Sequence, residues 1–209
     1  MKVYDVSMTI SHDIQVYKNK EDKKPVFETT SNFNQQNVYE TKMCMNLHTG
    51  THMDFPLHMV RGGKTSDTLD LSKLIRKVKV FDLTHVKEEI TAGDLEPLDI
   101  QVDDFVLFKT KNSYEETFNF KFVYLRKDSA AYLAAKKVAG VGIDALGIER
   151  DQENHPTHHI LMDQEIMIIE GLRLEAVEEK TYMMYALPIK IKAVEALPLS
   201  VILVEESYD

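Results

Sequence analysis

Four side chains that could bind a metal ion lie close together in the run LHTGTHMDFPLHM, residues 47–59. They are separated by four, two and four residues: His48, His52, Asp54 and His58. A glycine and a proline interrupt the run, which disfavours a helix, whereas an extended chain would place all four side chains on one face. Imidazole nitrogen with carboxylate oxygen suits Zn²⁺, Mn²⁺ or Fe²⁺, and a ligand set without thiolate indicates a catalytic rather than a structural site.

A second group of polar residues lies further along the chain. His155, His158 and His159 fall within five residues, and Glu170 closes the apolar run IMII. A carboxylate at the end of a buried strand costs free energy unless it is paired or bound to a cation, so Glu170 is a candidate ligand. Taken alone, Glu170 could equally face water. Asp144 could orient a ligand or cap a turn, and His155 and His159 are more typical of surface positions or of contacts to a ligand residue.

The run from residue 48 resembles the signature of the cyclase family of metal-dependent hydrolases, His-x-Gly-Thr-His-x-Asp-x-Pro-x-His, a family that includes bacterial kynurenine formamidase. The segments VGIDALGIE, HHILMDQEIMIIEGL and YALPIKI are also similar to the family, so the resemblance covers most of the chain. It implies a site for two divalent ions, most often Zn²⁺, with Mn²⁺ or Fe²⁺ as alternatives.

Carried onto this sequence, the resemblance gives each site residue a role. His48, His52 and Asp54 would bind the first metal, and Asp54 would bridge to the second. His158 and Glu170 would complete the site, and His158 is preferred over its neighbour because it lies twelve residues before Glu170. The remaining histidine of the signature, His58, would be the general acid/base.

The implied reaction is hydrolysis of an amide or formamide C–N bond by a metal-activated hydroxide, as in the arylformamidase step of tryptophan catabolism. Family members with this activity resemble one another in a Val-Trp-Pro-Gly segment, where this chain has Val16, Tyr17, Lys18 and Asn19. Tyr17 could still stack on a substrate ring. The difference favours an alternative substrate, such as a cyclic amide, imide or ketone. A non-catalytic metal-binding protein is a separate alternative. His58 favours catalysis, because a reaction needs it and the metals do not.

The charge balance excludes several partners. Lys and Arg number 25 against 34 Asp and Glu, a net charge of −9, which disfavours nucleic acid and a basic membrane-surface helix. The single cysteine, Cys44, cannot form an internal disulfide. The charged, alternating N-terminus is atypical of a signal peptide or a membrane span. These features predict a soluble cytoplasmic protein with a small-molecule substrate.

The elements that must position these residues predict an α/β class rich in strands. The 209 residues contain no linker or repeat, so one domain, 1–209, is expected. A helix is expected over 128–139, capped by Asp128 or Ser129 and ended by Gly140, with a short helix or turn over 91–95. Strands flank the longer helix at 105–109 and 141–145, which implies a parallel pair. The other expected strands are 3–10, 27–37, 39–47, 77–83, 166–169, 182–187 and 201–204.

The resemblance adds an expectation for the whole molecule. It implies a compact, swivelling β/β/α arrangement that assembles as a homodimer or homotetramer. Residues 12–24 are polar and rich in lysine, so they are expected to form a surface loop that could cover another part of the protein. Within it, residues 18–24 could be a lid, an interface element or simply a solvated loop.

Overall fold

The computed structural model describes residues 1–205, and its centre is one sheet of eight strands in the order β1-β12-β11-β5-β7-β9-β10-β4. Strand β4 also pairs with β12, so seven of these strands close into a ring with β1 added at its edge. The strands are β1 (Lys2–Asp5), β4 (His52–Asp54), β5 (Ile75–Asp82), β7 (Phe105–Lys109), β9 (Gly140–Ile143), β10 (Met167–Glu170), β11 (Thr181–Pro188) and β12 (Ala196–Glu205).

The sheet is mixed, as the strand–helix–strand pattern predicts. Strands β5, β7, β9 and β10 are parallel neighbours, and the other pairings are antiparallel. Every residue of β7 is buried, and its side chains alternate between two hydrophobic clusters. Phe105 and Leu107 pack inside the closed sheet, while Val106 and Phe108 pack against the helices. Burial on both faces explains why this strand is a continuous apolar run.

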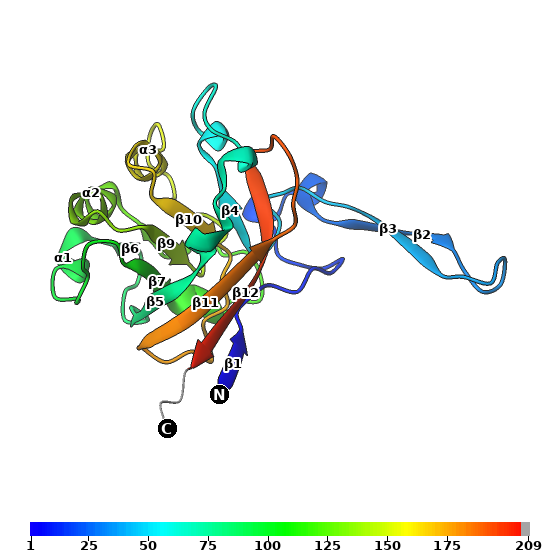
Figure 1. Ribbon diagram of the computed structural model, residues 1–209, viewed down its shortest axis with the longest axis horizontal. Helices are drawn as coiled ribbons and strands as arrows, with labels where there is room; N and C mark the ends of the chain where they lie inside the picture. The colour runs from blue at the N-terminus through cyan, green and yellow to red at the C-terminus, as the bar shows by residue number, and fades with distance from the viewer. Residues whose placement is uncertain (206–209) are drawn as a thin grey trace.

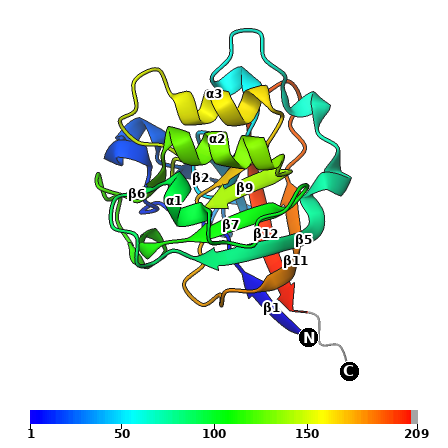
Figure 2. The same cartoon turned by 90° about the vertical axis from the view of Figure 1, so that its left-hand side faces the viewer.

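Three helices complete the mixed α/β fold: α1 (Ala92–Leu95), α2 (Lys127–Lys136) and α3 (Pro156–Asp163). Figure 2 shows α2 and α3 side by side in front of β7 and β9, with Leu133 and Leu161 in the cluster beneath them. The expected short helix is present, and Thr91 and Asp94 form a capping box at its start. Among residues 1–205, no helix has the length and apolar character needed to cross a bilayer.

Several expected boundaries were wrong. Helix α2 begins one residue earlier than expected, and its N-cap, Arg126, makes no side-chain cap hydrogen bond. The carboxylate of Asp128 instead accepts hydrogen bonds from Arg126 and from the Ala92 amide, and Ser129 donates to the Ile90 carbonyl. The helix ends at Lys136 and is followed by Lys137 in a left-handed conformation, so Gly140 opens β9 instead of stopping the helix. Helix α3 was not expected at all.

Two short sheets lie outside the main one. Strands β2 (Val26–Ser31) and β3 (Glu40–Cys44) form a hairpin that projects from the body of the molecule, as Figure 1 shows. It is shorter than the expected strands 27–37 and 39–47. Strands β6 (Glu89–Ile90) and β8 (Tyr124–Leu125) form a parallel pair beside α1 and α2. Six 3-10 turns occur at Tyr17–Asn19, Glu21–Lys23, Pro56–His58, Ser66–Thr68, Leu71–Leu74 and Lys111–Tyr114.

Candidate active site

Strands β4 and β10 bring the first site residues together. His52 and Asp54 alternate with Met53 along β4, so both point to one side while Met53 packs into the core. In the antiparallel register, His52 lies opposite Glu170, the last residue of β10. The His52 Nε2 atom is therefore 3.2 Å from Glu170 Oε2, and it is 3.5 Å from Asp54 Oδ1.

Helix α3 supplies the next residue, His158. Its Nε2 atom lies 3.7 Å from Asp54 Oδ2 and 3.6 Å from Glu170 Oε1. A second hydrogen-bond donor fixes that carboxylate, because the Ile148 amide donates to Glu170 Oε1 at 2.5 Å. Asp54 and Glu170 therefore both face His52 and His158, and these four side chains are almost fully buried.

His48 and His58 reach the cluster through turns instead of an extended chain. The expectation of one extended face over residues 48–58 was wrong, because the backbone turns at Gly50, where φ is 73°, and enters a 3-10 turn after Pro56. The turn places His48 Nδ1 3.2 Å from Asp54 Oδ1. The rings of His48 and His58 lie 4.2 Å apart, and His58 is 5.9 Å from His158.

The imidazole nitrogens and carboxylate oxygens of this cluster are spaced to bind a divalent cation. The atoms His52 Nε2, Asp54 Oδ1 and Asp54 Oδ2 are buried and have no hydrogen-bond partner. Two ligands about 2.1 Å from a tetrahedral cation would lie about 3.4 Å apart. The spacings of 3.2–3.7 Å between imidazole nitrogens and carboxylate oxygens match this edge length. Since unpartnered polar atoms are costly to bury, a cation explains why these side chains remain buried here.

The imidazoles and carboxylates shift one another's pKa values strongly. Burial opposes the charged form of His52, but Glu170 and Asp54 raise its pKa to about 9. Despite burial and the neighbouring Asp54, His158 and His52 lower the pKa of Glu170 to about 2. Burial likewise opposes ionisation of Asp54, yet His158 and His48 hold its pKa well below the ordinary value. Both carboxylates are therefore ionised at neutral pH, which is the form that binds a cation.

His58 differs from the other histidines of the cluster. Burial lowers its pKa below the ordinary value of 6.5, although Asp54 acts in the opposite direction. A neutral imidazole at neutral pH can accept a proton and then return it, as a general acid/base must.

The cluster opens into a cavity of about 220 Å³. His48, His58, His158 and Glu170 line one side of it, and Tyr17 and Lys23 line it from residues 12–24. The Thr49 hydroxyl donates a hydrogen bond to the Lys23 carbonyl, which ties this segment to the histidine run. Two side chains of residues 12–24, Tyr17 and Lys23, therefore lie at the site of their own chain.

Comparison with known proteins identifies the family. Residues 4–150 match the model of the family Cyclase, described as "Putative cyclase". The chain belongs to the cyclase family. The matched residues include the whole run from His48 to His58, which the fold gathers around Asp54.

Individual relatives of this cyclase-family chain span its length. It is 30% identical over 206 residues to a kynurenine formamidase of Salinibacter ruber, covering 97% of each chain. A solved structure from Bacillus stearothermophilus, described as a predicted metal-dependent hydrolase, is 52% identical with a TM-score of 0.89, covering 97% of both chains. Isatin hydrolase A from Ralstonia solanacearum has the same fold at 18% identity, with a TM-score of 0.82 and coverage of 97% and 91%.

Three residues of this cyclase-family site were missed by the sequence analysis. Glu149 contacts His158, Lys23 lines the cavity, and Glu195 Oε1 lies 3.5 Å from His48 Nε2. None belongs to the histidine signature, and Lys23 and Glu195 lie in polar segments that resemble any solvated loop. Glu149 had one usable signal, because it is a glutamate six residues before His155, at the end of VGIDALGIE.

Asp144 caps a turn, the second of its two expected roles. Its carboxylate accepts hydrogen bonds from the backbone amides and hydroxyls of Thr110 and Ser113, at 2.7–3.0 Å. Burial raises its pKa in spite of these donors.

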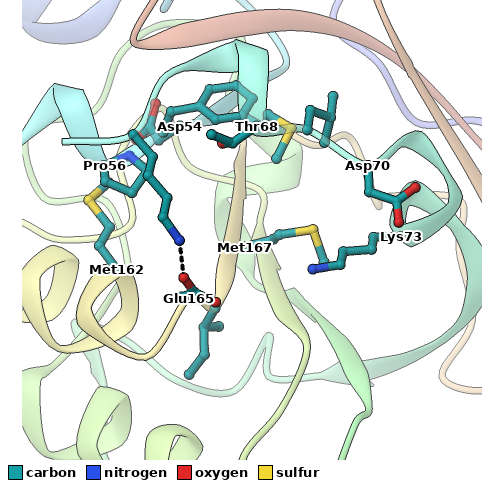
Figure 3. Close-up of a pocket in the computed structure, with 13 residues that line it drawn as sticks. Asp54, Pro56, Thr68, Asp70, Lys73, Met162, Glu165 and Met167 are labelled. Carbon is teal, nitrogen blue, oxygen red and sulfur yellow. Dashed lines mark hydrogen bonds and ion pairs between the residues drawn. The ribbon is translucent and has the colours of Figure 1, made fainter.

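A second cavity, of about 130 Å³, lies beside Asp54, Pro56 and the end of α3 and is drawn in Figure 3. Lys64 and Glu165 form an ion pair across it, and Met162 and Met167 contribute apolar wall. Within the described chain, its lining includes Asp54 but no histidine. The 220 Å³ cavity beside His58 is therefore the one suited to the chemistry of the cyclase family.

Proposed function

We propose that this chain is a metal-dependent hydrolase of amide C–N bonds, with an arylformamide as the first candidate substrate. The proposal rests on one observation: the potential ligand atoms of His52 and Asp54 are buried and have no hydrogen-bond partner. The less buried His58 lies beside them at the cavity wall. A protein that only bound a cation would not need His58. The similarity to kynurenine formamidases over the whole chain supports the same reaction class.

In this proposal the cations are held by the residues that face one another across the cluster. His48, His52 and Asp54 would hold one ion, and Asp54, His158 and Glu170 would hold the other. Divalent ions bound there would lower the pKa of water towards roughly 7 and polarise a substrate carbonyl. Zn²⁺ is the first candidate because imidazole and carboxylate are among its common ligands.

The chain's own residues then bind the substrate and move the proton. His58 lines the cavity and, neutral at neutral pH, takes a proton from the attacking water and passes it to the departing nitrogen. Tyr17 lines this cavity, so its ring is available to pack against an aryl group, and Phe118 supports it from behind with ring centres 5.3 Å apart. The Lys23 ammonium, 5.5 Å from the Tyr17 ring centre, could pair with a substrate carboxylate.

The experiment begins with the purified protein and its metal content. We expect bound divalent metal by elemental analysis, hydrolysis of N-formylkynurenine that stops with a chelator, and recovery with Zn²⁺ or Mn²⁺. Asp54→Ala should abolish metal loading, because Asp54 faces three of the four imidazoles. A protein that hydrolyses no amide with either metal would contradict the proposal, and an Asp54→Ala variant that keeps its full metal content would contradict the bridging role.

A second candidate substrate is a cyclic amide or imide. It is favoured by Tyr17, which stands where formamidases of the family have tryptophan. The same metal-loaded protein should therefore be tested with N-formylkynurenine and with isatin or a simple cyclic imide, at equal concentration. A higher kcat/KM on the cyclic substrates would select this alternative and retain the reaction class.

A further inference from the structure

Glu149 is a buried carboxylate that the proposed chemistry does not use. It follows β9 in the segment that leads to α3, and only 4% of its surface is exposed. Its Oε2 atom accepts hydrogen bonds from the Thr157 amide at 2.7 Å and from Gln152 Nε2 at 3.2 Å. Its Oε1 atom faces two imidazoles, with His155 Nδ1 at 2.8 Å and His158 Nδ1 at 3.2 Å.

The two nitrogens of His158 thus face different partners. The Nε2 atom faces Asp54 and Glu170, and the Nδ1 atom faces Glu149. Nδ1 is buried and has no well-aligned hydrogen bond, so the Glu149 carboxylate is the acceptor within reach for its proton. An acceptor at Nδ1 keeps the proton on that nitrogen and leaves the Nε2 lone pair free for a cation.

We propose that Glu149 is a positioning residue that holds His158 with Nε2 directed at the metal ions. The inference rests on the proposed function, because it requires His158 to be a ligand. Glu149 performs this task from the start of α3. Its carboxylate accepts a hydrogen bond from the Thr157 amide, which fixes the first turn of the helix. The same carboxylate faces Nδ1 of the next residue, His158, and so fixes the orientation of that ring.

An alternative use of the same atoms is a separate cation site. Ligand atoms of Glu149, His155 and His158 lie within 4.8 Å of one another, as a cation would require. However, His155 is 58% exposed in its side chain and already lies at hydrogen-bond distance from Glu149, and Oε2 is occupied by two donors. The arrangement therefore favours a carboxylate that orients imidazoles over one that binds a cation.

The test compares Glu149→Gln with Glu153→Gln, since Glu153 is an exposed glutamate in the same segment and a matched control for loss of one charge. Cation affinity is measured by calorimetry with Zn²⁺ and Mn²⁺ on protein stripped with a chelator. We expect Glu149→Gln to bind at least one cation about 10–100-fold more weakly, as for other groups that orient metal-bound histidines. Glu153→Gln should bind like the wild type, and Glu149→Asp should recover part of the loss.

A second readout separates positioning from a purely structural role. The visible spectrum of the Co²⁺-loaded protein should change in Glu149→Gln and stay unchanged in Glu153→Gln, because only the first alters a ligand's orientation. If Glu149→Gln lowers the melting temperature of the stripped protein but leaves affinity and spectrum unchanged, Glu149 only caps the helix and the inference is wrong.

A third variant decides between the two uses of the carboxylate. His155→Ala should keep the wild-type metal stoichiometry, and loss of one ion per chain would show that a cation binds Glu149 and His155 directly. A wild-type protein that binds no divalent cation would overturn the proposed function and this inference together. A wild type that binds metal and hydrolyses amides, with Glu149→Gln indistinguishable from Glu153→Gln, would overturn this inference alone.

Discussion

His58 is the residue whose removal should separate chemistry from metal binding. It lines the cavity beside His48, and one of its nitrogens lies within 4.8 Å of an Asp54 oxygen. Among the described residues it forms no ion pair with Asp54 or Glu170, unlike His52 and His158. His58→Ala should therefore lower kcat by about 10²–10⁴-fold, the usual contribution of a positioned acid/base, while metal content stays at the wild-type level. Steady-state kinetics and elemental analysis on the same sample check both parts.

The matched control is His85→Ala, which removes an exposed histidine outside the cavity and should change neither quantity. If His58→Ala loses metal together with turnover, His58 is a ligand and the acid/base assignment fails.

The pKa of His52 predicts an unusual pH dependence of stability. Without a bound cation, its pKa is raised from 6.5 to about 9 by Glu170 and Asp54, despite burial. The folded state therefore binds this proton more tightly than the unfolded chain, so the stabilisation is complete below pH 6.5 and is lost as the pH rises through 9. Urea unfolding of the chelator-treated protein should show a lower free energy of unfolding at pH 9 than at pH 6.5.

A bound cation should reverse this trend, because it competes with the proton for the imidazole. With saturating Zn²⁺, the free energy of unfolding should rise over the same pH range. Equal stability of the stripped protein at both pH values would show that the carboxylates do not hold a proton on His52.

At the scale of single residues, the sequence identified most of the side chains that the fold gathers into the candidate site, but fewer of the residues that contact them. His52, Asp54 and Glu170 could be found because a metal site needs particular residue types, and their spacing along the sequence is characteristic. Lys23 could not be found and Glu149 left only a weak signal, because each contacts segments that only the fold brings together. A buried glutamate and a solvated one have the same letter in the sequence.

At the scale of structural elements, the backbone after β10 packs closely against the turn at Gly50. Gly171 follows Glu170 with φ of 71°, and a Cβ there would lie 2.5 Å from the Gly50 carbonyl oxygen. Gly171→Ala must therefore both adopt a left-handed conformation and push two site segments apart. We expect it to lower the free energy of unfolding by at least about 2 kcal/mol and to weaken metal binding.

Gly62→Ala is the control for backbone conformation alone. Gly62 has a φ of 73°, but no atom lies within 4 Å of the Cβ position. The Gly62→Ala variant should lower the free energy of unfolding by roughly 1 kcal/mol and leave metal affinity unchanged. Equal effects of the two substitutions, measured by urea unfolding and calorimetry, would mean that the close approach of Gly171 to Gly50 does not matter.

The packing of each strand or helix explains whether the sequence could predict it. Strand β7 was predicted with its exact bounds, because a strand buried on both faces leaves a continuous apolar run. Helix α3 was missed because its eight residues, PTHHILMD, begin with a proline and two histidines that suggest chemistry more than a helix. The first turn of the helix depends on Glu149, which lies outside the helix and whose carboxylate accepts a hydrogen bond from the Thr157 amide. The cap of α2 was misassigned for a similar reason, since Asp128 bonds to Ala92 of another helix.

At the scale of the whole molecule, the closed sheet explains how residues far apart in sequence form one site. Strand β4 pairs with β10 on one side and with β12 on the other, so the ring is closed at the strand that carries His52 and Asp54. Closure brings Glu195, which precedes β12, to His48 across almost 150 residues of chain. The proposed metal site and the closure of the sheet therefore depend on the same strand.

The hairpin of β2 and β3 projects from the body of the molecule (Figure 1), where its Phe27 ring contacts His12 edge-on at 4.7 Å. Every residue of β3 is exposed, and apolar side chains lie on the hairpin with exposed fractions of 45–73%: Val26, Phe33, Val38, Tyr39 and Met43. An isolated two-stranded hairpin is only marginally stable in water, and exposed apolar patches mark interfaces. We propose that the hairpin packs against a second copy of this chain, which agrees with the homodimer or homotetramer expected from the sequence.

Phe33→Glu tests this proposal, because it places a charge on the most exposed aromatic side chain of the hairpin. Light scattering after size exclusion should give a mass above the 24.1 kDa of one chain for the wild type and a smaller assembly for the variant at the same concentration. Phe120→Glu is the control, since Phe120 is 59% exposed but lies outside the hairpin, and it should assemble like the wild type. A monomeric wild type would contradict self-association, and a Phe33→Glu variant with the wild-type mass would place the interface elsewhere. Since all the residues that line the cavity, Tyr17 and Lys23 among them, come from one chain, the smaller assembly should still bind the metal ions.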